Sequence, residues 1–153
     1  MIQTIVVAAD HGGIIYKDRI AEKLRQQGLH VLDLGTNDDA PTDYPEFARR
    51  AATVVANGEA DVGIVVCGSG IGVSIVANKT PGIRAANCVT TEMARLARQH
   101  NHANVLALGQ RLMPWETAWG IVEVFLETSP DEDERHCRRV AQIHEPERRN
   151  ERP

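Results

Sequence analysis

Aromatic side chains are scarce in this sequence of 153 residues, because Phe, Trp and Tyr together make up only 4% of it. The core must therefore be aliphatic, and a hydrophobic content of 42% supplies enough Val, Ile, Leu and Ala to build one. A domain of this length buries most of the surface that its unfolded chain exposes. We predict a single domain over residues 1–144, followed by a charged tail over residues 145–153 that is frayed.

Cysteine is also rare, and Cys67, Cys88 and Cys137 are odd in number and widely spaced. This pattern favours reduced thiols over a disulfide framework. The sequence has no apolar run near the roughly 18 residues of a membrane helix, and no basic segment of a signal peptide at its start. The formal net charge of −4 argues against general binding of nucleic acid or anionic membranes. We therefore expect a cytoplasmic protein without nucleic-acid or membrane partners.

Short apolar runs alternate along the chain with longer amphipathic segments. The apolar runs predict buried strands over residues 4–9, 30–33, 62–66, 83–87 and 105–108. The segments between and after them predict helices over 14–27, from Asp43 to 57, from 72 to 78, from Thr90 or Thr91 with Met93 on its apolar face, from Pro114, and over 135–143. The alternation predicts an α/β fold, a three-layer α/β/α sandwich with a five-stranded parallel Rossmann-like sheet.

The segment Cys67–Gly72 (CGSGIG) carries the strongest chemical signal, since it follows a predicted buried strand and begins a helix. Ligands in such folds bind at the carboxyl ends of the strands. Glycines let backbone N–H groups turn toward a phosphate or toward the negative oxygen of an enediolate. A helix N-terminus favours a reactive thiolate, so Cys67 is a candidate base; a buried, inert Cys is the structural alternative. Ser69 can hydrogen-bond that thiolate or an enediol, or simply cap the helix.

Asp10 and His11 follow the first predicted strand. A carboxylate and an imidazole there can exchange protons with a sugar or bind its phosphate, although Asp10 could instead stabilise a turn. The glycines after them faintly resemble a dinucleotide site, but the G-x-G-x-x-G pattern is absent.

His100 and His102 flank Asn101 between the fourth helix and the fifth strand. One imidazole could open a sugar ring by general acid–base catalysis. Together with His136 or Cys137, the two imidazoles could instead bind a metal, although this spacing alone is weak support.

Arg135 and Arg139 are four residues apart and hence share one face of the last predicted helix. Two guanidinium groups on one face suit a phosphate dianion, and Arg111 is a further candidate. The structural alternative is a solvated basic face paired with the acidic residues 131–134. Trp115 and Trp119 are expected to pack or to lie in a subunit interface.

Together these residues resemble the ribose/galactose phosphate isomerase family, and within it the type B ribose-5-phosphate isomerases. The resemblance extends from about residue 5 to 143, with its motifs in the family's order. The matching segments are Ala9–Gly12 (ADHG), Thr42–Pro45 (TDYP), Cys67–Gly72, Ala77–Lys79 (ANK), Pro81–Ala85 (PGIRA), His100–Asn101, Asn104–Leu106 (NVL), Arg135–His136 and Arg139–Val140.

The resemblance implies an aldose–ketose isomerase that interconverts ribose 5-phosphate and ribulose 5-phosphate without a metal or cofactor. Cys67 would be the base at C2 of the sugar, and Asp10 and His100 would open its ring. The resemblance also implies that the enediolate is bound by Ser69 and the backbone amides of Gly68, Gly70 and Gly72. Sugar hydroxyls would be bound by Asn101 and Asp43. The phosphate would be bound by His11, Arg111, Arg135 and Arg139.

The same resemblance implies a homodimer, or a dimer of dimers, with sites between subunits. His102 stands where the family usually has Asp, which leaves the orientation of His100 open. Cys88 and Cys137 have no implied role.

Two alternatives remain at this point. One keeps the mechanism and changes the substrate to galactose 6-phosphate, allose 6-phosphate or a tetrose phosphate. The other is a nonenzymatic receiver or nucleotide-sensing module of the same architecture. A phospho-receiver needs Asp at the end of its third strand, where this chain has Cys67.

Overall fold

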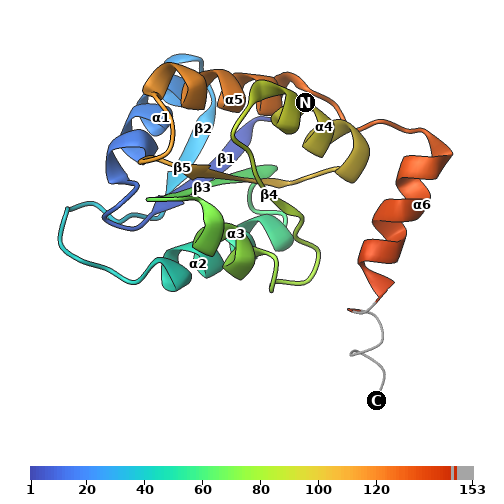
Figure 1. Ribbon diagram of the computed structural model, residues 1–153, viewed down its shortest axis with the longest axis horizontal. Helices are drawn as coiled ribbons and strands as arrows, with labels where there is room; N and C mark the ends of the chain where they lie inside the picture. Colours follow the sequence, from blue (N-terminus) through green and yellow to red (C-terminus); the bar gives the residue numbers. More distant parts are fainter. Residues whose placement is uncertain (146, 148–153) are drawn as a thin grey trace.

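The computed structural model of the protein describes residues 1–145 and 147, so most of the tail predicted over 145–153 lies outside the described residues. Strands and helices alternate from the start of the chain to α5, and α6 follows as an additional helix (Figure 1). The elements are β1 (Thr4–Ala9), α1 (Ile14–Gln26), β2 (His30–Asp33), α2 (Tyr44–Ala56), β3 (Val62–Cys67), α3 (Ile71–Ala77), β4 (Ala85–Asn87), α4 (Thr91–Asn101), β5 (Val105–Gly109), α5 (Trp115–Glu127) and α6 (Glu134–Ile143).

The five strands form one parallel sheet in the order β2-β1-β3-β5-β4. Ile64 in the central strand β3 is in register with Val7 of β1 on one side and with Leu106 of β5 on the other. All strands run the same way, so their carboxyl ends meet at a single edge of the sheet. The predicted parallel sheet is confirmed.

Helices cover both faces of the sheet, which gives the three predicted layers (Figure 1). Ile5 and Val7 of β1 face α1, α4 and α5, whereas Val6 and Ala8 face α2 and α3. Both sets are fully or almost fully buried. β1 is therefore apolar at every position, because each of its two faces packs against a helical layer.

Some boundaries differ from the prediction. β4 begins at Ala85 instead of residue 83, because Ile83 N–H donates to Thr80 O in the preceding turn. Met93 was predicted on the apolar face of its helix, but it is 42% exposed, while Ala94, Ala97 and Arg98 are the residues that α4 buries. The two small alanine side chains let α4 lie close to α5.

The tryptophans of α5 pack within the chain. Trp115 and Trp119 stack on one another, and Arg19 and Lys23 of α1 lie over their rings at 4.0 and 4.6 Å from the centroids. Both rings therefore belong to the contact between α1 and α5, which confirms the packing role expected for them.

Helix α6 lies outside the three layers and contacts α4 (Figure 1). No helix in the described part of the chain combines the length and apolarity of a membrane span.

Candidate active site

Cys67 is the last residue of β3, all six residues of which are buried. Its Sγ accepts the backbone N–H of Gly70 at 3.1 Å, and the residue is 5% exposed. Cys67 also lines an open cleft of about 590 Å³ at the carboxyl edge of the sheet. The residues around this cleft, which we call the Cys67 cleft, are Asp10, Tyr44, Cys67, Gly68, Ser69, Ile71, Gly72, Ile75, Arg111 and Leu112.

The turn after Cys67 is closely packed at Gly70, where φ is +76°. A methyl group on Gly70 would lie 2.5 Å from Asn87 Oδ1 and 2.9 Å from the carbonyl carbon of Leu108. Only glycine satisfies both the left-handed backbone and this approach. The N–H of Gly70 is directed at the Cys67 sulfur, so this amide ties the turn to the thiol.

Ser69 lines the cleft and hydrogen-bonds the first residue of α3, but it is not the cap of that helix, because the residue that directly precedes α3 is Gly70. Its Oγ accepts the N–H of Ile71 at 3.2 Å, at the start of α3. The hydroxyl proton remains available as a donor toward the cleft.

Asp10 and His11 are fixed at the end of β1 by backbone groups. Asp10 is 8% exposed, and its Oδ1 accepts the N–H of Gly12 at 2.9 Å. His11 exchanges two bonds with Thr42, because its Nδ1 accepts the Thr42 N–H at 3.2 Å and its own N–H donates to Thr42 Oγ1 at 3.3 Å. Since Nδ1 is an acceptor, the proton of a neutral His11 ring is on Nε2.

Arg111 provides the positive charge of the cleft. Its guanidinium lies over the backbone of two glycines, so that a methyl group on Gly68 would be 3.2 Å from Nη1 and one on Gly12 would be 3.5 Å from Nη2. No carboxylate forms an ion pair with Arg111 among the residues that the structure describes. The guanidinium is therefore available to an anionic ligand.

Asp43 and Tyr44 differ from expectation. Asp43 is the residue before α2, as predicted for a cap, but its side chain accepts no capping hydrogen bond, and it is exposed and outside the cleft lining. Tyr44 lines the cleft instead, and a methyl group on Gly72 would be 2.7 Å from its ring. Sequence reasoning missed Tyr44 as a cleft residue, although it lies within the TDYP segment.

The remaining predicted site residues lie at the other edge of the sheet. His100 and Asn101 end α4, just before the amino end of β5, and Arg135 and Arg139 are on α6. Cys67 is at the carboxyl end of β3, a strand of six residues that spans about 20 Å. None of these four residues lines the Cys67 cleft. Within one chain, the structure does not bring the two groups together.

His100 stacks face to face on His136, with 4.3 Å between ring centroids and 5° between ring planes. His136 is 5% exposed, and Arg135 Nη2 lies 3.3 Å from its Nε2. Arg135 and Arg139 are both exposed. We call these four residues the α4–α6 cluster.

His102 has φ of +49°, and its Nε2 lies 2.8 Å from Asp131 O. Its ring therefore contacts the connection before α6, whereas the ring of His100 is oriented by His136. Across the described residues, no three His, Cys, Asp or Glu side chains are grouped as possible metal ligands.

Cys88, at the end of β4, differs chemically from Cys67. It is 1% exposed and lines none of the cleft, and burial raises the pKa of its thiol to about 11. Cys88 is therefore a core residue, and Cys67 is the cysteine that meets the cleft.

Known proteins share this sequence pattern and fold. The model of a protein family described as Ribose/Galactose Isomerase matches residues 5–143. The ribose-5-phosphate isomerase B of Escherichia coli (strain K12) is 44% identical over 93% of this chain and 95% of that protein. The structure of Clostridium thermocellum ribose-5-phosphate isomerase B has a TM-score of 0.94 at 44% identity, covering 97% of this chain and 99% of that one. The structure of Mycoplasma genitalium ribose-5-phosphate isomerase B with bound ribulose-5-phosphate has a TM-score of 0.89 at 42% identity. It covers 95% of this chain and 96% of that one.

Proposed function

Because this chain belongs to the Ribose/Galactose Isomerase family and is therefore an isomerase, we propose that it interconverts ribose 5-phosphate and ribulose 5-phosphate. The observation that carries this proposal is the thiol of Cys67, which meets an open cleft beside the guanidinium of Arg111. The relative from Mycoplasma genitalium, solved with ribulose-5-phosphate, supports the choice of substrate. We also infer a cytoplasmic location, which suits three free thiols.

In the proposed reaction, the thiolate of Cys67 removes the proton from C2 of the open-chain aldose. The electron pair moves into an enediolate, and the proton of the C2 hydroxyl is transferred to the C1 oxygen. The Cys67 thiol then returns its proton to C1, which leaves a hydroxyl at C1 and a ketone at C2. No step needs an oxidant, a metal or a cofactor. The negative oxygen of the enediolate would accept from Ser69 and from free N–H groups of the turn, each worth about 3 kcal/mol by analogy with oxyanion holes.

Arg111 and the Nε2–H of His11 are the proposed phosphate contacts at this edge. Phosphate binding by these groups would orient the sugar for reaction, because the phosphate itself does not react. Asp10 is placed to exchange protons with the ring oxygen or hydroxyls, within the same cleft.

One chain holds only part of the proposed site, so we infer that a second copy completes it. The α4–α6 cluster of the partner would supply an imidazole for ring opening and two guanidinium groups for the phosphate, and Asn101 would bind sugar hydroxyls. The rim of the cleft supports such a contact, because Ile71, Ile75 and Leu112 are 54%, 56% and 62% exposed. Exposed apolar side chains beside a cleft favour burial against a partner subunit.

Subunit mixing tests this arrangement directly. Cys67→Ala and His100→Ala should each be inactive alone. In a two-fold dimer, a hybrid of the two variants has one site with both mutations and one site with neither. Random exchange makes half of the dimers hybrids, so about a quarter of wild-type activity should return. A mixture that exchanges subunits and stays inactive would show that each site comes from one chain.

Isotope exchange tests the reaction itself. With ribose 5-phosphate in D₂O, deuterium should enter C1 or C2 with wild-type protein, and no exchange should occur with Cys67→Ala. The family also includes galactose in its description, so kcat/KM should be compared with galactose 6-phosphate and allose 6-phosphate. A higher kcat/KM for a hexose phosphate would show that the preferred substrate is that hexose phosphate and not the pentose. Full activity of Cys67→Ala would refute the assigned base.

A further inference from the structure

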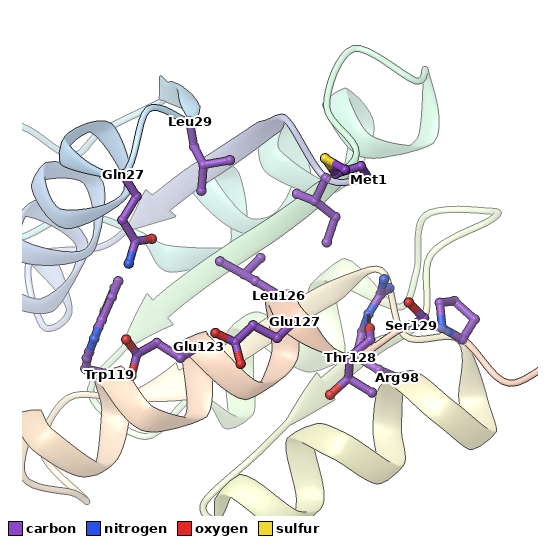
Figure 2. Close-up of a pocket in the computed structure, with 12 residues that line it drawn as sticks. Met1, Gln27, Leu29, Arg98, Trp119, Glu123, Leu126, Glu127, Thr128 and Ser129 are labelled. Atoms are coloured by element: carbon purple, nitrogen blue, oxygen red, sulfur yellow. Dashed lines mark hydrogen bonds between the residues drawn. The ribbon is translucent and has the colours of Figure 1, made fainter.

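A second cavity, of about 460 Å³, lies at the amino edge of the sheet and shares no lining residue with the Cys67 cleft. It opens between the start of the chain, the end of α1 and α5 (Figure 2). Arg98 of α4 contributes to it near Thr128, while Trp119 and Gln27 lie toward its other end (Figure 2). Its volume is within the range of small-molecule sites.

Arg98 is the unusual residue of this cavity, because it is a cation that is only 8% exposed. Its Nε donates to Thr128 O at 3.2 Å and its Nη1 to Ala103 O at 2.6 Å. The guanidinium carbon also lies 5.2 Å from the centroid of the Phe125 ring. Nη2 has no acceptor among the described residues, so one of the two terminal nitrogens remains without a protein partner.

The charge of Arg98 also lacks compensation. No ion pair in the described part of the chain includes it. Burial, and then the positive charge of Arg84, lower the pKa of its guanidinium from the usual value, so the surroundings disfavour this cation. A buried charge without a counter-ion is costly, and an anion at Nη2 would relieve that cost.

The rest of the cavity restricts which anion fits. Leu29, Leu126 and Trp119 provide an apolar wall (Figure 2). Glu123 and Glu127 line the same cavity and oppose a second negative charge. A sugar phosphate dianion is therefore a poor match on both charge and polarity.

We propose that this cavity binds a small organic monoanion, a carboxylate carried on an apolar body. The carboxylate accepts from Nη2 of Arg98, and the apolar body lies along Leu126 and Trp119. This site is separate from the proposed isomerase site and does not depend on the identity of the sugar substrate.

The first test titrates the full-length protein with 4-phenylbutyrate, using calorimetry and tryptophan fluorescence, since Trp119 lines the cavity. We expect saturable binding of one probe per chain. The neutral analogue 4-phenylbutan-1-ol should bind at least tenfold more weakly, because it lacks the charge. No saturable binding of the carboxylate, equal binding of the alcohol, or displacement of the probe by inorganic phosphate would overturn the proposal.

Variants of the cavity test the contact with Arg98. Arg98→Met should weaken binding of 4-phenylbutyrate about ten- to hundredfold, which is the range for loss of a hydrogen bond to a charged group. Arg95→Met is the matched control on the same helix, because Arg95 pairs with Glu92 and does not line the cavity. That control should bind like wild type. Unchanged binding in Arg98→Met would refute the site.

Arg98→Met also removes two bonds to backbone carbonyls, so a second variant keeps the test independent of folding. Leu126→Trp should fill the cavity and abolish binding while Arg98 is intact. Glu127→Gln should tighten binding of the carboxylate probe about two- to fivefold, since it removes a repelling charge. If Leu126→Trp binds normally, or Glu127→Gln binds more weakly, the probe does not occupy this cavity.

Discussion

The Cys67 cleft and the α4–α6 cluster are held in place by different kinds of contact. In the cleft, the turn after β3 is fixed by backbone approaches, such as Gly70 against Leu108 and Gly13 against Val66. In the cluster, side chains hold the helix: His136 stacks on His100, and few contacts join α6 to the rest of the fold. Close backbone packing leaves the turn little room to move, which suits the fixed position that the proposed base needs.

The far end of α6 is tied down by a short polar chain. Arg84 Nη1 lies 2.5 Å from His144 Nε2, and His144 Nδ1 lies 2.8 Å from Glu147 Oε2. The same carboxylate oxygen accepts the N–H of Gly82 at 3.1 Å. Because these contacts are partly exposed, α6 should open locally at a lower free energy than the turn after β3.

The largest expected effect is that of Gly70→Ala. The new methyl group would meet Asn87 and Leu108 within 2.9 Å, in a left-handed backbone conformation. We expect a stability loss of about 3 kcal/mol or more, and a fall in kcat of at least about a hundredfold, as the Cys67 turn shifts. Denaturant unfolding and isomerase kinetics measure the two losses.

Gly58→Ala is the matched control. Gly58 has a similar φ of +74°, but a methyl group there would meet nothing within 4 Å. It should cost only about 1 kcal/mol, from backbone strain, and leave kcat unchanged. If both variants lose the same stability and activity, close packing of the turn is not what fixes the cleft.

A smaller effect is expected from His136→Ala, which removes the ring that stacks on His100. The released imidazole of His100 loses its fixed orientation, so kcat should fall roughly tenfold, which is less than the roughly hundredfold minimum for loss of an acid–base group, because His100 itself remains. His136→Phe keeps an aromatic face and should retain most of the activity. Equal losses in the two variants would indicate that His136 acts through its nitrogens and not through stacking.

The difference between the Cys67 cleft and the α4–α6 cluster also explains which parts of the molecule were predictable from sequence. The turn after β3 is local: a buried strand, glycines and a helix follow one another, so the order of residues alone assigns Cys67 to a ligand-binding edge. The same holds for Asp10 and His11, since a parallel sheet brings the ends of all its strands to one edge.

What sequence could not provide is the separation of His100 from Cys67. Both belong to one set of motifs, and chain order does not say whether a helix end and a strand end share an edge of one subunit. Arg98 was missed for a related reason. In a helix of mixed polarity, an arginine is expected to be solvated, and only tertiary packing by Phe125 and Thr128 buries it.

Glu147→Gln should have a still smaller effect, confined to α6. Burial raises the pKa of Glu147, but its bond from His144 and the N–H of Gly82 oppose this, and the net pKa lies below the usual value. A lowered carboxyl pKa means that the stabilisation is present above the usual carboxyl pKa, about 4.3, and is lost as pH falls through the folded value. At pH 7, hydrogen exchange in α6 should quicken about two- to fivefold. Exchange in β3 should not change, and an equal increase there would mean that α6 does not open separately.

The smallest effect is expected at Cys88, and it sharpens the comparison with Cys67. With a pKa of about 11, only about one Cys88 thiol in a thousand is ionised at pH 8, and the residue is 1% exposed. Iodoacetamide at pH 8 should therefore leave Cys88 unmodified in the folded protein, and Cys88→Ala should keep kcat within about twofold. Peptide mass mapping after increasing times of alkylation, compared with the activity that remains, shows which cysteine is modified when activity is lost. Loss of activity should follow modification of Cys67 and be as fast in Cys88→Ala as in wild type, because Cys67 lines the cleft of the proposed active site and Cys88 does not.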